Sequence, residues 1–338
     1  MARRSRKNRS TTTPSKIEVN IRAIRLLPPT GWKLYDLEEF PIVGTVPKNY
    51  LAYGDPLSPT TTGYIAKKGR LKADARECVT EEIISKIGAM LPLVNMARSM
   101  LVRVSKQDVR FLSQNFVERG RFELLHGIEL AARYFQSNPS EVESAFELSD
   151  PNREQDFYTI PNILEILASL FPLELQKLEE GFFRMLAFDA FIGAPDRHGM
   201  NWGVLSPIGG NAGSVRFSPI FDTARGLFRE CSDTDLIKHA QRNGRIGYIK
   251  KYADRSRPIF SSGRGQKDNH FSLVRWISEA LPEKHRKSIC RVFDSVCISE
   301  IERMLQRQFR RIITQDRIGF IRDLLAFRID RLQQEVRT

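Results

Sequence analysis

The spacing of apolar residues changes once along the chain, near residue 127, and this change restricts the possible folds more than any other feature. Between residues 32 and 117 the apolar residues form short runs separated by Pro and Gly, as in β-strands. After residue 127 they recur at helical spacing over long stretches. The sequence therefore predicts an α+β fold with a small β-rich lobe over residues 26–127 and a larger, mostly helical lobe over residues 128–338.

Four short runs in the first lobe have the composition of strands. They cover residues 49–53, 63–67, 99–104 and 109–117. We expect these runs to pair in one antiparallel sheet. A helical pattern lies between the second and third runs, with Asp74 as the expected N-cap and Glu77 at the N3 position. One helix should therefore interrupt the sheet.

The second lobe combines long helical patterns with one hairpin. Helices are expected at residues 128–135, 163–170 and 173–192. Residues 202–205 and 215–217 flank a turn-rich segment and are predicted to form a β-hairpin. The last helix carries one apolar stripe, which should pack against the rest of the lobe. This stripe consists of Ile318, Ile321, Leu325, Ile329 and Leu332.

The composition is that of a packed globular protein. Of the 338 residues, 41% are hydrophobic and 28% are charged, which excludes a wholly disordered or collagen-like chain. The four cysteines include no C-x-x-C pair, and the N-terminal residues lack the apolar segment of a secretory signal. We therefore expect a reducing, cytoplasmic location, with a secreted effector as the alternative. No apolar stretch is long enough for a membrane span.

Positive charge is concentrated at the N-terminus. The net charge is +13, and residues 1–25 contain eight basic residues against one acidic residue. Residues 1–15 are rich in Arg, Ser and Thr and cannot bury enough surface to fold, so we expect residues 1–25 to form a disordered tail. One interpretation is an arm for nucleic acid, anionic lipid or targeting. The other is a solvated terminus without a partner.

Three polar residues in the second lobe have the spacing of a phosphoryl-transfer site. Asp196 lies in a predicted loop, Asn201 follows five positions later at the start of the hairpin, and Asp222 stands at its end. Asp196 could orient an attacking hydroxyl or accept its proton. The hairpin should bring Asn201 and Asp222 together, so that their oxygens can hold Mg²⁺ against nucleotide phosphates.

The first lobe contains a lysine that could bind phosphate at such a site. Lys67 ends an apolar strand, and Glu81 on the next helix could pair with it, as a strand lysine and a helix glutamate do in kinases. Thr61 and Thr62 precede this strand and could contact phosphates, or simply belong to an ordinary β-turn. We interpret His198 as a residue that hydrogen-bonds the catalytic loop, and not as a base or metal ligand.

Four strings surround these residues: YIAKKGR at 64–70, LLHGIEL at 124–130, DAFIGAPDRHGMNWGVL at 189–205 and SPIFDTARGL at 218–227. They resemble the HipA-like kinases, especially the short CtkA-like branch of that family. The resemblance implies a two-lobed protein-kinase-like fold that binds ATP and Mg²⁺ and has serine/threonine protein kinase activity. It also implies a hinge whose backbone meets adenine, formed by His126, Gly127 and Ile128.

The resemblance assigns a role to each candidate residue. Lys67 and Glu81 would be the phosphate-binding ion pair, Asp196 the catalytic carboxylate, and Asn201 and Asp222 the metal ligands. Two alternatives stay open. A phosphoinositide-type lipid kinase also has an Asp-Arg-His-x-x-Asn loop, and the positive charge would suit a pseudokinase that serves as a nucleic-acid-binding scaffold.

The segment after Asp222 bears on the substrate. Residues 225–257 contain nine basic and four acidic residues, an excess of five positive charges. In a kinase this segment lies beside the cleft where the acceptor docks. We therefore expect a protein substrate that is acidic near its acceptor hydroxyl or that is associated with nucleic acid. The alternative is a solvated loop whose charges never meet substrate, and whether the chain also phosphorylates itself is left open.

Overall fold

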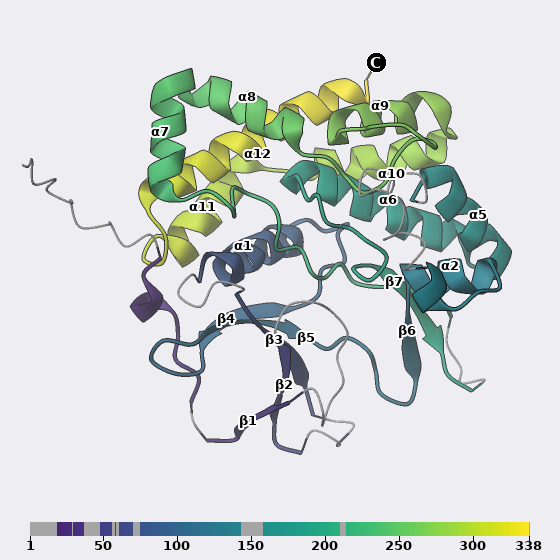
Figure 1. Ribbon diagram of the computed structural model, residues 1–338, viewed down its shortest axis with the longest axis horizontal. Helices are drawn as coiled ribbons and strands as arrows, with labels where there is room; N and C mark the ends of the chain where they lie inside the picture. Colours follow the sequence, from purple (N-terminus) through teal and green to yellow (C-terminus); the bar gives the residue numbers. More distant parts are fainter. Residues whose placement is uncertain are drawn as a thin grey trace, which may run out of the picture.

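The computed structural model describes residues 19–28, 30–36, 48–55, 58, 61–69, 75–142, 158–209 and 214–337. These residues form a sheet-containing lobe and a larger helical lobe, and helix α1 lies between the two (Figure 1). The α+β architecture expected from the sequence is thus confirmed. Among the described residues, no helix combines the length and the apolar character needed to cross a membrane.

The first sheet has five antiparallel strands in the order β1-β2-β3-β5-β4. The strands are β1 (Trp32–Tyr35), β2 (Lys48–Tyr53), β3 (Gly63–Lys68), β4 (Ser99–Arg103) and β5 (Val109–Gln114). Helix α1 (Arg76–Met90) lies between β3 and β4 in the chain, as predicted. Its expected N-cap, Asp74, is outside the described residues, and Ala75 precedes the helix instead.

Strand alternation gives the two faces of this sheet different environments. Leu51, Ala66, Val102 and Leu112 form a small core on one face. Lys67 follows Ala66 in β3 and points to the opposite face, where its ammonium group meets α1. The period of two in β3 therefore aims Lys67 at the helix and away from the apolar core.

A second, three-stranded sheet joins the two lobes. It contains β6 (Phe122–His126), β7 (Gly203–Pro207) and β8 (Arg216–Phe217), in the order β6-β7-β8. The predicted hairpin is confirmed as β7 and β8, where Val204 pairs with Phe217. Strand β6 was not predicted. Because it pairs with β7, the first sheet ends at Gln114, before the lobe boundary expected at residue 127.

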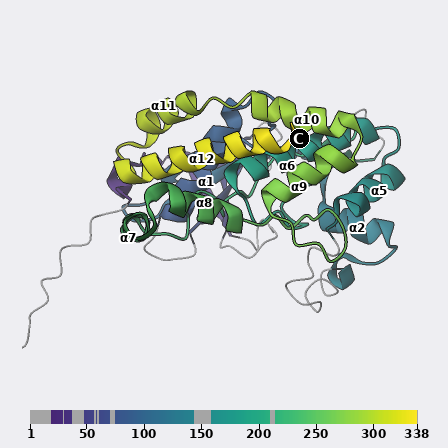
Figure 2. The ribbon, with the colours of Figure 1, turned by 90° about the horizontal axis from the view of Figure 1, so that it is seen from above.

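Helices make up the rest of the chain. They are α2 (Gly127–Tyr134), α5 (Ile160–Leu170), α6 (Leu175–Ile192), α7 (Asp233–Asn243), α8 (Arg245–Arg255), α9 (His270–Ala280), α10 (Glu283–Asp294), α11 (Ile298–Phe309) and α12 (Gln315–Glu335). Helix α12 runs through the middle of this lobe and contacts α6, α8, α9 and α11 (Figure 2). All five residues of its predicted apolar stripe are buried, which confirms the expected docking.

The start of the described chain belongs to the fold. Asn20 donates its N–H to the carbonyl of Ile312 at 2.7 Å, and Leu27 donates to Arg103 at 2.8 Å. Between them, the short 3-10 helix η1 (Ile21–Ala23) leads to the buried side chain of Ile24. Residues 19–25 are therefore packed against both lobes, and the expected tail over residues 1–25 is wrong for this part because Ile24 has apolar surface to bury.

Candidate active site

Lys67 is the centre of the cluster between the lobes. Its Nζ atom lies 2.6 Å from Oε1 of Glu81 on α1 and 3.0 Å from Oδ1 of Asp222, which follows β8. Lys67 and Glu81 are only 5% and 2% exposed, so this contact is shielded from water. The structure thus brings together three residues that the sequence analysis had predicted from separate segments.

Burial and neighbouring charges shift the pKa values of this cluster in opposite directions. Burial alone would lower the pKa of Lys67, but the carboxylates of Asp222 and Glu81 outweigh it and raise this pKa. Burial would raise the pKa of Asp222, yet Lys67 and Lys48 hold it well below its usual range. At Glu81 burial dominates and raises the pKa to about 7, against the opposing effect of Lys67. Lys67 and Asp222 therefore stay charged at neutral pH, where Glu81 titrates.

A second lysine, which the sequence analysis missed, reaches the same carboxylate. Lys48 is the first residue of β2, and its Nζ lies 3.6 Å from Oδ2 of Asp222. Lys48 pairs in register with Lys67 across the two antiparallel strands, so both lysines lie at the same end of this strand pair. The signal for Lys48 was a cation at the start of a strand, but only the strand pairing identifies it as part of the site.

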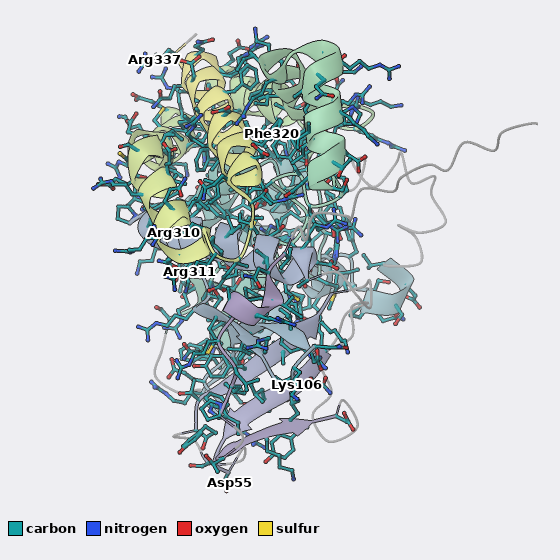
Figure 3. All side chains as sticks on the ribbon, turned by 90° about the vertical axis from the view of Figure 1, so that its left-hand side faces the viewer. Asp55, Lys106, Arg310, Arg311, Phe320 and Arg337 are labelled. Carbon is teal, nitrogen blue, oxygen red and sulfur yellow. The ribbon has the colours of Figure 1, made fainter. Side chains whose placement is uncertain are left out.

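The same register corrects the expected phosphate contact of Thr61 and Thr62. Both residues precede β3, whereas Lys67 is near its end, and at about 3.3 Å per residue Thr62 lies roughly 16 Å from Lys67 along the strand. The turn between β2 and β3 is at the far end of the lobe, as Asp55 shows in Figure 3. Of the two interpretations, only the ordinary turn agrees with this position.

The loop after α6 presents Asp196 and Asn201. Gly193 ends the helix in the left-handed conformation, with φ of 72°, which glycine adopts without a Cβ clash. Asn201 donates its amide Nδ2–H to the carbonyl oxygen of Asp196 at 2.8 Å. Nδ1 of His198 accepts the N–H of Met200 at 3.3 Å, in agreement with its interpretation as a loop-forming residue.

Arg197 holds this loop in place, although sequence reasoning did not single it out. It is 2% exposed and forms two hydrogen bonds of 2.7 Å with the carboxylate of Asp189 on α6. Its Nη1 donates to the carbonyls of Asn201 and Phe221, each at 2.7 Å. Arg197 therefore links the loop after α6 to the residue before Asp222. An aspartate among the apolar residues of α6 was the only sequence signal for this partner.

The backbone at Asp222 is unusual. Its φ is 54°, in the left-handed region that residues with a side chain seldom adopt. The Arg197 bond to the preceding carbonyl and the ion pairs with Lys48 and Lys67 hold the residue in this conformation. Such strain is maintained where the position of a side chain matters, and here it turns the carboxylate towards Lys67.

The expected hinge at His126, Gly127 and Ile128 needs correction. Their N–H groups donate to Oε2 of Glu129 at 2.7 Å, to the carbonyl of Trp202 at 3.0 Å and to the carbonyl of Gly199 at 3.2 Å. These groups are therefore not available to adenine.

The connection between the two sheets lies earlier in the chain. It runs through residues 115–121, which follow the last strand of the first sheet. Phe116, on this connection, packs against Phe221, with 5.4 Å between ring centroids, and the ring of His126 is 6.1 Å from Phe221. His126 therefore borders the cleft through its side chain, while residues 115–121 occupy the place of a hinge.

The carboxylate of Asp196 has a partner from the segment after Asp222. Arg225 contacts it twice, with Nε 3.0 Å from Oδ2 and Nη1 3.2 Å from Oδ1. Arg225 and Asp196 line one pocket together with Lys67, Glu81 and Asp222. The predicted catalytic residue Asp196, the predicted metal ligand Asp222 and the ion pair of Lys67 with Glu81 therefore face one shared space.

Two lobes with a Lys–Glu–Asp cluster between them, and an Asp–Asn loop beside it, define a protein with a kinase-like fold. The family model for the HipA-like C-terminal domain matches residues 40–271, and the chain belongs to this family. No curated protein sequence gives a significant match.

Solved structures agree with the fold. The Helicobacter pylori proinflammatory kinase CtkA is similar with a TM-score of 0.65 and 17% identity, over 86% of this chain and 94% of that chain. HipA of Shewanella oneidensis MR-1, from a toxin–antitoxin complex with HipB and operator DNA, is similar with a TM-score of 0.50 and 13% identity. That match covers 93% of this chain and 75% of HipA. The HipA-like, CtkA-like fold expected from the sequence is confirmed.

Proposed function

We propose that this protein is a Mg²⁺- and ATP-dependent kinase that phosphorylates serine or threonine hydroxyls of proteins. The observation that carries the proposal is the position of Lys67 Nζ, 2.6 Å from Glu81 and 3.0 Å from Asp222. Kinases use a strand lysine, held by a helix glutamate, to bind nucleotide phosphates next to a metal-binding aspartate. Membership in the HipA-like family and the likeness to CtkA support the same activity.

Asp196 is the proposed group that orients the acceptor hydroxyl and accepts its proton. It lies on a loop whose geometry is set by the buried Arg197 and by the hydrogen bond from the Asn201 amide to the carbonyl of Asp196. Arg197 binds the carbonyl of Asn201, and Asn201 binds the carbonyl of Asp196. Because neither contact uses the carboxylate of Asp196, that carboxylate can meet the acceptor once Arg225 moves away. Catalysis would then depend on positioning and charge, with no covalent enzyme intermediate.

The oxygens at the site suit Mg²⁺. The Asn201 amide nitrogen is engaged by the Asp196 carbonyl, which orients the amide and leaves its oxygen as a ligand. Asp222 supplies a carboxylate whose pKa is lowered by Lys67 and Lys48 despite its burial. Mg²⁺ commonly takes one or two protein oxygens and completes its shell with water and phosphate oxygens. When bound, Mg-ATP supplies the phosphoryl group and the metal neutralises its charge.

Lys48 and Lys67 are the proposed phosphate-binding pair. Both ammonium groups point at Asp222, at 3.6 and 3.0 Å, so the two cations converge on the space beside the proposed metal ligands. Glu81 holds Lys67 through a contact of 2.6 Å and so restricts the position of its Nζ. The complete set of charged groups argues against a pseudokinase.

The test is transfer of labelled γ-phosphate from ATP, with protein mixtures and phosphoinositide vesicles offered in parallel. We expect Mg²⁺-dependent label on serine or threonine of protein. Label confined to phosphoinositide would replace the proposal with a lipid kinase. Absence of any turnover, together with salt-sensitive binding of RNA or DNA, would instead support a scaffold.

A further inference from the structure

A second pocket adjoins the catalytic loop, and five of its lining residues are lysines or arginines. It has a volume of about 620 Å³, which is within the range of pockets that bind small-molecule ligands. Pro195, directly before Asp196, forms part of its wall. Its basic lining residues are Arg225, Arg229, Lys251, Arg255 and Arg257, and Glu230 is the one acidic residue of its described lining. We refer to this space as the basic pocket.

The cations of the basic pocket differ in their partners. Arg225 pairs with Asp196, and Arg229 Nη1 lies 2.6 Å from Oε1 of Glu77 on α1. For Lys251, Arg255 and Arg257, no ion pair or side-chain hydrogen bond is found within the described ranges. These three positive charges face one hollow whose described lining contains a single carboxylate, that of Glu230, and the excess of positive charge favours an anion there.

The fold explains why these three cations face the same way. Lys251 and Arg255 are four positions apart on α8, and so they share one face of the helix. Arg257 follows the end of this helix. Tyr248 and Tyr252, also on α8, anchor the helix by packing against Phe228. The neighbouring Lys250 is exposed on a different face and is not among the lining residues.

Arg225 connects the basic pocket with the catalytic cluster. It lines both spaces, and its guanidinium occupies both carboxylate oxygens of Asp196 at 3.0 and 3.2 Å. While this contact persists, the guanidinium occupies one acceptor position on each carboxylate oxygen and competes with an acceptor hydroxyl for Asp196. An anion that enters the basic pocket offers Arg225 an alternative partner and so releases Asp196.

From this geometry we infer that the basic pocket binds acidic side chains of a peptide acceptor, which also draw Arg225 away from Asp196. The inference rests on the proposed kinase function and names the substrate class of the same site. A peptide is favoured over a nucleic acid because the pocket is a single hollow beside Asp196, and its occupant must also carry the acceptor hydroxyl. Carboxylates a few residues from a serine satisfy both conditions.

The test compares two serine peptides that differ only in charge, one with Asp and Glu around the serine and one with Asn and Gln. Wild-type protein should phosphorylate the acidic peptide with a kcat/KM about tenfold higher or more, and the preference should shrink as salt is raised. Lys251→Glu should abolish the preference through a higher KM for peptide, with KM for ATP unchanged. Lys250→Glu, the same charge change on the same helix, should keep the preference.

Arg225→Gln gives a second, independent measurement. Loss of the Asp196 contact should raise transfer to the neutral peptide relative to wild type and reduce the advantage of the acidic one. Thermal unfolding of each variant shows whether it is folded, and fluorescence anisotropy of the labelled acidic peptide reports binding without any turnover.

The outcomes separate this inference from the kinase assignment. Equal use of both peptides by the wild-type protein, or equal effects of Lys251→Glu and Lys250→Glu, would overturn the basic pocket as the acceptor site while phosphoryl transfer itself stands. Acidic-peptide binding that depends on Lys251, without phosphoryl transfer to any acceptor, would overturn the kinase function instead. If single-stranded DNA or phosphoinositide vesicles, and not the acidic peptide, bind in a manner that depends on Lys251, the peptide is the wrong occupant.

Discussion

Nζ of Lys67 and Oδ1 of Asp222 lie 3.0 Å apart, although Lys67 is in β3 of the first sheet and Asp222 follows β8 of the second. The contact therefore joins the two lobes at the point where the proposed nucleotide phosphates and metal would sit. Lys48 reaches the same carboxylate from β2, and Arg197 fixes the residue before it. Each of these contacts can be tested separately.

Lys48 should matter for nucleotide binding, and Thr61 and Thr62 should not. Lys48→Ala is expected to raise KM for ATP about tenfold or more, since a charged contact contributes about 1.5–3 kcal/mol. The double variant Thr61→Val, Thr62→Val is the matched control and should keep the wild-type KM, because both residues lie at the far end of β3. The measurement is steady-state kinetics at varied ATP. A larger effect of the threonine change would contradict the strand register as the basis of the site.

Asp222 should carry the dependence of nucleotide binding on Mg²⁺. Asp222→Ala removes the proposed carboxylate ligand, and we expect the gain in ATP affinity on adding Mg²⁺ to fall by about 10–100-fold, as it does even for residues that only support a metal ligand. Titration with a fluorescent ATP analogue, in Mg²⁺ and in EDTA, measures this gain directly. An unchanged gain in a folded variant would remove Asp222 from the metal site.

Asp189 should be essential for stability through Arg197. Asp189→Asn leaves the guanidinium buried without its counter-charge, and breaking a buried pair in this way costs about 3–5 kcal/mol of unfolding free energy. Urea unfolding measures the loss. Glu300→Gln breaks the exposed pair with Arg303 at 3.4 Å and serves as the control, for which no clear change is expected. Equal stability of the two variants would mean that Arg197 does not need Asp189.

The pH profile should report on Glu81. Its pKa is raised to about 7 by burial, so it gains a proton as the pH falls through this value, and Lys67 then loses one of its two carboxylates. Asp222 stays ionised because its pKa is lowered. We expect kcat/KM for ATP to fall towards lower pH with a midpoint near 7. Glu81→Gln cannot titrate and should lack this limb, whereas ionisation of ATP itself is common to both proteins. If kcat/KM falls in the same way at low pH in both proteins, a group other than Glu81 causes the decrease.

Local patterns made the main elements predictable. The strands around Lys67, helix α1 with Glu81, the hairpin of β7 and β8, and the apolar stripe of α12 each depend on periodicity within a short segment. The order of Lys67, Glu81, Asp196, Asn201 and Asp222 along the chain was therefore enough to predict that they meet.

The errors in the predicted site arise from pairing between distant segments. Thr61 and Thr62 were misplaced because the sequence does not show which end of β3 faces the cleft, and this depends on its register with β2. The hinge was misplaced because β6 joins β7, about 80 residues later in the sequence, and this pairing gives Gly127 an internal partner. Arg197 was missed because its role depends on two contacts outside its own loop, with the carboxylate of Asp189 on α6 and with the carbonyl of Phe221.

Phosphoryl transfer by Asp196→Asn tests the central claim most directly. The substitution removes the carboxylate but keeps the shape of the residue and its backbone bond to Asn201. We expect transfer of labelled phosphate from Mg-ATP to protein to fall by about 10²–10⁴-fold, the usual contribution of a positioned acid or base, while ATP affinity stays close to that of the wild-type protein. Transfer near the wild-type rate in the folded Asp196→Asn variant, or no transfer by the wild-type protein with any acceptor, would contradict the account.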